Sequence, residues 1–69
     1  MSLRYVLFRD DPSTHDEVYL SRAEGKGTKV GFKPVKRVEL TSLQFGTAAE
    51  GYAFAKHFPE LEYWRVGLR

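Results

Sequence analysis

The sequence contains no cysteine, and this absence excludes several kinds of site at once. Without thiols the chain has no disulfide bonds, no thiolate zinc ligands and no cysteine nucleophile, and its composition fits a reducing compartment. Long hydrophobic runs are absent as well, since no apolar stretch approaches the roughly 20 residues that span a membrane. No basic segment followed by an apolar one opens the chain, as it would in a secretory signal peptide. We therefore expect a cytoplasmic protein.

The chain is also short, and its 69 residues are enough for one domain, which we take as residues 1–69. A domain of this size buries only about 60% of its unfolded surface, so we expect marginal stability. We also expect no hollow as large as the roughly 300 Å³ that small ligand sites need. Hydrophobic residues make up 42% of the sequence and aromatic residues 14%, which is sufficient for a small core and argues against disorder.

Side chains for catalysis or metal binding occur only as fragments. His15 stands among acidic residues in the segment 10–17, but on a proline-containing loop that lacks the spacing by which ligands converge on a metal. His57 is expected near a helix end, where an imidazolium ion favours the helix dipole. The segment 25–27 lacks the full glycine spacing of a phosphate loop, and no serine has the context of a nucleophile elbow. We therefore expect no metal, no cofactor and no enzymatic activity.

The clearest local signal is a helix start in the segment 45–66. Thr47 and Glu50 form a capping box, in which the threonine hydroxyl accepts from the N–H of Glu50 and the glutamate accepts from the N–H of Thr47. Pro59 disfavours helical geometry at the residue before it, so the pattern predicts a helix over about 48–58. One apolar arc of this helix contains Ala48, Gly51, Tyr52, Phe54, Ala55 and Phe58.

Four further segments have the composition and alternation of β-strands. They are residues 3–9, 17–22, 28–33 and 61–68, with a glycine-containing hairpin turn between the second and the third. Pro34 has no N–H to donate and should end the third strand. In the segment 35–44, a short strand near 37–40 and one helical turn after Pro34 fit equally, and we favour the strand. Phe45 is expected to plug the core just before the helix.

Together these segments predict an α+β fold in two layers, a three- to four-stranded, mainly antiparallel sheet with one helix packed on one face. One helix covers only one face of a sheet, so the other face is expected to be open. The alternation of the strands places on that face some of Tyr5, Tyr19, Lys29, Lys33, Tyr63 and Arg65.

Positive charge is concentrated in one stretch, although the net charge is only +2. Between Gly25 and Val38 there is no acidic residue, and the cations there are Lys26, Lys29, Lys33, Lys36 and Arg37. Such a stretch attracts phosphate oxygens or an acidic protein surface through the same Coulomb interaction, or it is simply solvated surface. As partner-binding residues we predict Lys29, Lys33, Lys36, Arg37, Tyr63 and Arg65.

Several short stretches carry a resemblance to a known group of proteins. They are an opening YVLFR, a central VYLSR, the Phe-x-Thr-x-x-Glu helix start at Phe45, Thr47 and Glu50, and a closing EYWRV. In these the chain resembles the small, mostly uncharacterised accessory proteins that bacteriophages and prophages encode. It departs from their outline at Gly51, because alanine usually follows the capping glutamate. The resemblance implies an accessory protein that binds and modifies a host machine, such as an RNA polymerase inhibitor or an anti-CRISPR protein, and it implies no role for any single residue.

We therefore hypothesise a small non-enzymatic, phage-type binding protein that inhibits or modulates a host protein, one that itself handles nucleic acid. The first alternative is direct binding of single-stranded RNA or DNA by a basic, aromatic sheet face, although the aromatic and glycine pattern of the RNA-recognition motif is absent. The second alternative is a structural or assembly subunit whose edge strand pairs with a copy of itself. The sequence leaves the oligomeric state open.

Overall fold

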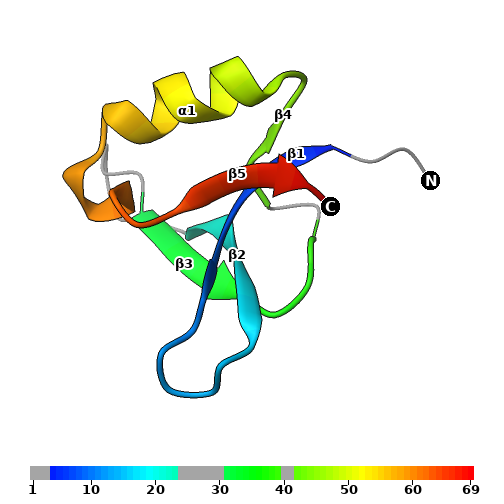
Figure 1. The fold of residues 1–69 in the computed structure, drawn as a ribbon, viewed down its shortest axis with the longest axis vertical. Coiled ribbons are helices and arrows are strands. Elements are labelled where there is room, and N and C mark those ends of the chain that lie inside the picture. Colours follow the sequence, from blue (N-terminus) through cyan, green and yellow to red (C-terminus); the bar gives the residue numbers. More distant parts are fainter. Residues whose placement is uncertain (1–3, 24–30, 40–41) are drawn as a thin grey trace.

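The computed structural model of the protein describes residues 4–23, 31–39 and 42–69 (Figure 1). Within these residues the chain forms five strands, one α-helix and one short 3-10 helix. In chain order they are β1 (Tyr5–Asp10), β2 (Glu17–Ala23), β3 (Gly31–Val35), β4 (Gln44–Phe45), α1 (Ala48–Lys56), η1 (Pro59–Leu61) and β5 (Arg65–Leu68). The predicted α+β fold is confirmed, with slightly more strands than the three or four expected.

β1 is the central strand of an open antiparallel sheet and pairs with three other strands. Its first residues pair with β4, Tyr5 opposite Phe45, and its last residues pair with β2, Phe8 opposite Tyr19. β5 pairs with the residues from Tyr5 to Phe8 and so overlaps both of these registers. β2 and β4 therefore share one edge of β1, and β5 lies on the other edge. β3 extends the sheet beyond β2. The helix α1 packs against β1, β4 and β5 and so covers one face of the sheet (Figure 1).

α1 begins where the capping pattern predicts. Thr47 is the N-cap, and its hydroxyl oxygen accepts from the N–H of Glu50 at 3.2 Å. The other half of the predicted capping box is wrong, because the Glu50 carboxylate accepts from the N–H of Gly46, at 3.2 Å, instead of that of Thr47. α1 ends at Lys56, two residues earlier than predicted. Phe58 is already extended, the geometry that a residue before proline prefers.

The strand predicted over 61–68 is shorter in the structure. Pro59 opens η1, because its fixed φ and missing N–H suit the first position of a helical turn. Leu61 belongs to this turn instead of a strand and is only 2% exposed. β5 begins only at Arg65. The turn folds Leu61 back toward α1 and into the core, whereas an extended segment would carry it past the core.

Two expectations for the middle of the chain are wrong. Pro34 does not end the third strand but lies within β3, opposite Leu20. Among the described strands β3 has no second neighbour, so a missing N–H is tolerated there. The described residues 36–39 contain no strand, and the short strand is instead β4, which follows a bridge between Ser42 and Ser21. The predicted glycine turn between β2 and β3 lies outside the described residues.

The core lies between α1 and the sheet. Its fully buried members are Leu7, Leu20, Leu43 and Leu61, and the half-buried side chains packed against them are Phe32, Phe45, Phe54, Ala55, Phe58, Trp64 and Val66. Phe45 plugs the core ahead of α1 as predicted, with its ring centroid 5.4 Å from that of Phe54. Burial of this apolar surface is the main favourable contribution to folding.

α1 approaches the sheet most closely at Gly51. A Cβ atom at this position would lie 3.0 Å from both methyl groups of Val66 and 3.4 Å from a ring carbon of Phe45. This contact explains why glycine stands where the resemblance predicts alanine. Tyr52, by contrast, is 52% exposed, so its predicted place in the buried arc is wrong. The apolar arc of α1 is therefore wider than the part of the helix that packs against the sheet.

Candidate functional site

The sheet face opposite α1, which we call the open face, is covered at its centre. Phe8 follows the core residue Leu7 in β1 and therefore points to the open face. Its side chain is only 9% exposed, because the guanidinium groups of Arg69 and Arg65 stack on it, 4.1 and 5.1 Å from the ring centroid. The ring also reaches over Gly67, where an added Cβ would lie 2.6 Å from it.

Acidic residues of β1 and β2 hold the two arginines. The Arg69 guanidinium donates to both carboxylate oxygens of Glu17, at 2.6 and 3.2 Å, and the Tyr19 hydroxyl donates to one of them at 3.0 Å. Arg65 lies 3.6 Å from the Asp10 carboxylate in a solvent-exposed pair. The hydrogen bond from Arg69 is the main cause of the lowered pKa of Glu17. Burial and donation to Glu17 raise the pKa of Tyr19.

We predict that this pair makes stability decrease as acid protonates Glu17. The pKa of Glu17 is lower in the folded state, so its contribution is complete above the ordinary value of 4.5 and is lost as the pH falls through the folded value. Urea midpoints measured from about pH 7 to about pH 3 should therefore fall less steeply for Glu17→Gln than for the wild type. Glu62→Gln removes a carboxylate that has no ion pair in the described residues and should follow the wild type. Parallel profiles for the wild type and Glu17→Gln would refute the role of the pair.

The predicted basic stretch is described in part, by Lys33, Lys36 and Arg37, which we call the basic segment. Lys33 lies in β3 opposite Ser21, and Lys36 and Arg37 follow in the bend after β3. All three side chains are exposed, and none forms an ion pair or hydrogen bond within the described part of the chain. Lys29, which we also predicted as a binding residue, lies outside the described residues.

The structure does not join the basic segment to the other two predicted binding residues. Tyr63 is 77% exposed in the turn before β5, and Arg65 is the first residue of β5. β5 and β3 are separated by β1 and β2, so Arg65 and the basic segment lie three strand spacings apart, or roughly 14 Å along the sheet. The acids Asp10 and Glu17 stand between them on β1 and β2. Sequence alternation placed Lys33 and Arg65 on the same face of the sheet but did not give the order of the strands.

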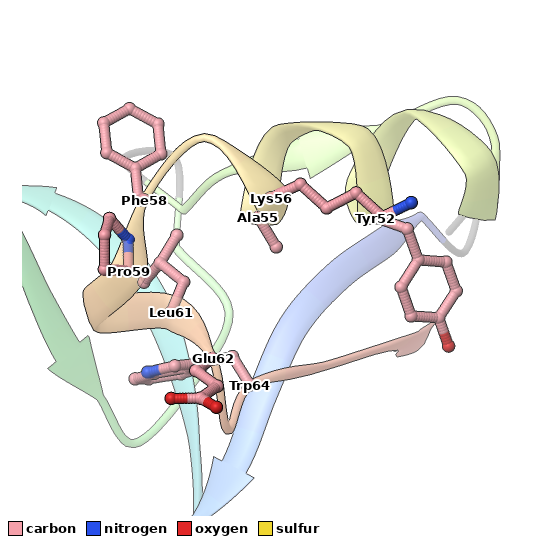
Figure 2. Close-up of a pocket in the computed structure, with 8 residues that line it drawn as sticks. All are labelled: Tyr52, Ala55, Lys56, Phe58, Pro59, Leu61, Glu62 and Trp64. Carbon is pink, nitrogen blue, oxygen red and sulfur yellow. The ribbon is translucent and has the colours of Figure 1, made fainter.

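A hollow that sequence reasoning missed lies beside the C-terminal end of α1. It is an open groove of about 490 Å³ between the helix and the turn that leads to β5 (Figure 2). It is lined by Tyr52, Ala55, Lys56, Phe58, Pro59, Leu61, Glu62 and Trp64. The expectation that so short a chain has no hollow of a few hundred cubic ångströms is therefore wrong. The only sequence signal for it is the Phe-Pro pair at 58–59, which ends α1 and starts η1 in a new direction.

Trp64 is a wall of this groove and also of a smaller hollow. The smaller hollow, of about 180 Å³, is lined in addition by Arg9, Asp11, Pro12, Val18 and Pro34. The Arg9 guanidinium lies 5.8 Å from the centroid of the Trp64 ring, within the range of a cation–π contact. The indole is therefore held between β1 and the groove.

The acidic loop between β1 and β2 uses its polar groups to hold its own turn. Asp11 accepts from the N–H of Ser13 through its carboxylate and from the N–H of His15 through its carbonyl, each at 2.8 Å. Within residues 4–23, 31–39 and 42–69, no three histidine or carboxylate side chains come together as they would to hold a metal ion. Nor does any helix in these ranges have the length and apolar character needed to cross a membrane.

No protein-family model matches the chain, and comparisons with curated proteins and with solved structures find no match either. The candidate binding surfaces of this chain are therefore defined by its own residues. They are the exposed basic segment at one end of the sheet and the apolar groove beside α1.

Proposed function

We propose that this chain is a small non-enzymatic, phage-type binding protein that attaches to a host protein machine through its basic segment and inhibits or modulates it. The partner in this proposal presents an acidic surface and itself handles nucleic acid, as in the RNA polymerase inhibitor or anti-CRISPR type. The proposal places this activity in the cytoplasm of the host cell. The observation that carries it is that the side chains of Lys33, Lys36 and Arg37 are exposed and have no ion-pair partner among residues 4–23, 31–39 and 42–69.

The contrast with Arg65 and Arg69 supports this proposal. Arg65 pairs with Asp10 and Arg69 pairs with Glu17. Both arginines also stack on Phe8, so their charges are partly neutralised within the chain. The basic segment has no such compensation in the described residues, and its field therefore extends into solvent. A field of this kind accelerates the encounter with an acidic surface and gives the contact its orientation.

The covered state of Phe8 favours a protein partner over direct binding of single-stranded nucleic acid. Base stacking needs exposed aromatic rings on the sheet. Phe8 lies under two guanidinium groups, and Tyr19 is half-buried and donates its hydroxyl to Glu17. Tyr63 is 77% exposed but lies in the turn before β5, away from the basic segment. The described part of the open face therefore lacks a stacking platform next to its cations.

We predict that serine at Lys33, Lys36 and Arg37 together will strongly reduce capture of the partner while the chain stays folded. All three side chains are exposed, so their removal leaves the core intact. The measurement is affinity capture from a bacterial lysate, with and without nuclease treatment. The control removes two other exposed cations, Arg4 and Arg22, and should capture the partner as the wild type does.

Each result of this experiment has a defined meaning. A protein captured in a nuclease-resistant manner by the wild type and the control, but not by the basic-segment variant, supports the proposal. Capture that disappears with nuclease supports direct nucleic-acid binding instead. Recovery of nothing except further copies of this chain supports an assembly subunit, and equal capture by both variants refutes a role for the basic segment.

A further inference from the structure

The groove beside α1 has rims of opposite charge. Lys56 and Tyr52 come from α1 on one rim, and Glu62 and Trp64 come from the turn before β5 on the other (Figure 2). The side chain of Lys56 lies diagonally across the groove from that of Glu62, whereas the ring of Tyr52 lies more directly opposite Trp64 (Figure 2). Neither Lys56 nor Glu62 forms an ion pair or a side-chain hydrogen bond within the described residues.

Aromatic side chains remain uncovered in and next to the segments that form the groove. Tyr52 belongs to the apolar arc of α1 but is half exposed, and Tyr63, next to two groove residues in sequence, is the most exposed large hydrophobic side chain of the described chain. Trp64 and Phe58, which line the groove, are only half-buried. Uncovered aromatic surface around a groove marks an interaction site more often than an ordinary solvated surface.

Opposite charges on the two rims are self-complementary under a two-fold rotation. An axis that lies in the plane of the contact, midway between Lys56 and Glu62, exchanges these two residues. Lys56 of one copy then faces Glu62 of a second copy, and the same contact occurs again in the opposite sense. Each favourable contact is thus made twice, as in every interface with two-fold symmetry.

We propose that the groove is a self-association surface whose occupant is a second copy of this chain, bound about a two-fold axis with reciprocal Lys56–Glu62 ion pairs. A second copy suits the groove because the groove itself carries both members of the complementary pair, Lys56 and Glu62. The groove contains no residue of the basic segment. Self-association is therefore a property separate from the partner binding proposed above. The contact is small, so the dimer is expected to be weak and to form with rising protein concentration.

The first measurement is the mass of the wild type by sedimentation equilibrium between about 1 μM and about 1 mM, the range of weak to moderate dissociation constants. The mass should rise from monomer to dimer across this range. Trp64 is the only tryptophan of the chain, so its fluorescence reports on the groove directly. Its emission should move to shorter wavelength as the dimer forms, because burial removes water from the indole.

Charge reversal gives the decisive comparison. Lys56→Glu alone and Glu62→Lys alone each create two like-charge contacts per dimer and should weaken association at least about tenfold. The double variant Lys56→Glu/Glu62→Lys should restore it, and so should an equimolar mixture of the two single variants. Glu60→Lys is the matched control, since it makes the same charge change on η1 but outside the groove lining, and it should associate as the wild type does.

The exposed positions of Lys56, Glu60 and Glu62 mean that all of these variants should fold, which circular dichroism verifies. A concentration-dependent mass, lost in each single variant and recovered in both the double variant and the mixture, supports the proposal. A monomer throughout the concentration range overturns it. So does a dimer that the single variants leave unchanged, or one that neither the double variant nor the mixture recovers.

Discussion

Replacement of Gly51 by proline is expected to leave the chain without a cooperative unfolding transition. The Gly51 N–H donates to the carbonyl of Thr47 at 3.4 Å, the first bond of the α1 ladder. Proline lacks this N–H and its ring clashes with the preceding turn, which costs about 3 kcal/mol or more. The new side chain also meets the Val66 methyl groups, which lie 3.0 Å from a Cβ at this position. A core of this size supplies only about 3–5 kcal/mol, so no stable fold should remain.

The matched control is Ala48→Pro, because proline is favoured at the first position of a helix. Thr47 before it is extended, with φ −135° and ψ 156°, as a residue before proline should be. Circular dichroism in a urea series compares both variants with the wild type, and Ala48→Pro should keep a midpoint close to the wild-type one. A cooperative transition near the wild-type midpoint in Gly51→Pro would mean that α1 does not dock on β5 through this residue.

Phe8→Ala is expected to unfold most of the protein at room temperature. Truncation of a buried phenylalanine costs about 3–5 kcal/mol, since the lost transfer free energy is joined by that of the cavity left behind. The cavity here would lie over Gly67, and the guanidinium groups of Arg65 and Arg69 would lose the ring on which they stack. The loss is therefore comparable to the whole stability expected of a chain this short.

Tyr63→Ala is the control for Phe8→Ala, because it removes an aromatic ring that is 77% exposed. Its free energy of unfolding should stay within about 0.5 kcal/mol of the wild type. Urea denaturation followed by circular dichroism gives both values. If Phe8→Ala lost no more stability than Tyr63→Ala, Phe8 would not be covered by the arginines. Its ring would then be available for base stacking on the open face.

The parts of the fold that follow from neighbouring residues could be predicted from the sequence. The start of α1 depends on the Thr47 hydroxyl and the N–H of Glu50, three residues away. The restriction that Pro59 places on Phe58 predicted the end of α1 only to within two residues, because the helix already ends at Lys56. Alternation likewise placed Val18 and Leu20 on one face of their strand, and both are buried.

The parts that depend on distant contacts could not be predicted in this way. β4 exists because Gln44 and Phe45 complete the edge of β1 that β2 leaves unpaired, which no local pattern reveals. η1 exists because a turn after Pro59 brings Leu61 into the core. Over such short segments, apolar residues fit strand and turn equally well, and tertiary packing decides between them.

The candidate site likewise has features that the sequence predicts and features that depend on distant contacts. The exposure of Lys33 could be predicted because its strand neighbour Phe32 supplies the buried face. The stacking of Arg65 on Phe8 could not, since it depends on which strand lies beside β1. The groove depends on the angle between α1 and η1, for which the sequence has no pattern beyond the proline itself.

The salt dependence of partner affinity tests most directly whether the basic segment is the binding surface. Binding of the captured partner is measured over a series of salt concentrations for the wild type and for the triple serine variant at Lys33, Lys36 and Arg37. We predict that wild-type affinity falls as salt rises, and that the variant binds more weakly with a shallower dependence, because screening acts on the charges that it lacks. Unchanged affinity together with an unchanged salt dependence in the variant would contradict the account, and would show that the basic segment is ordinary solvated surface.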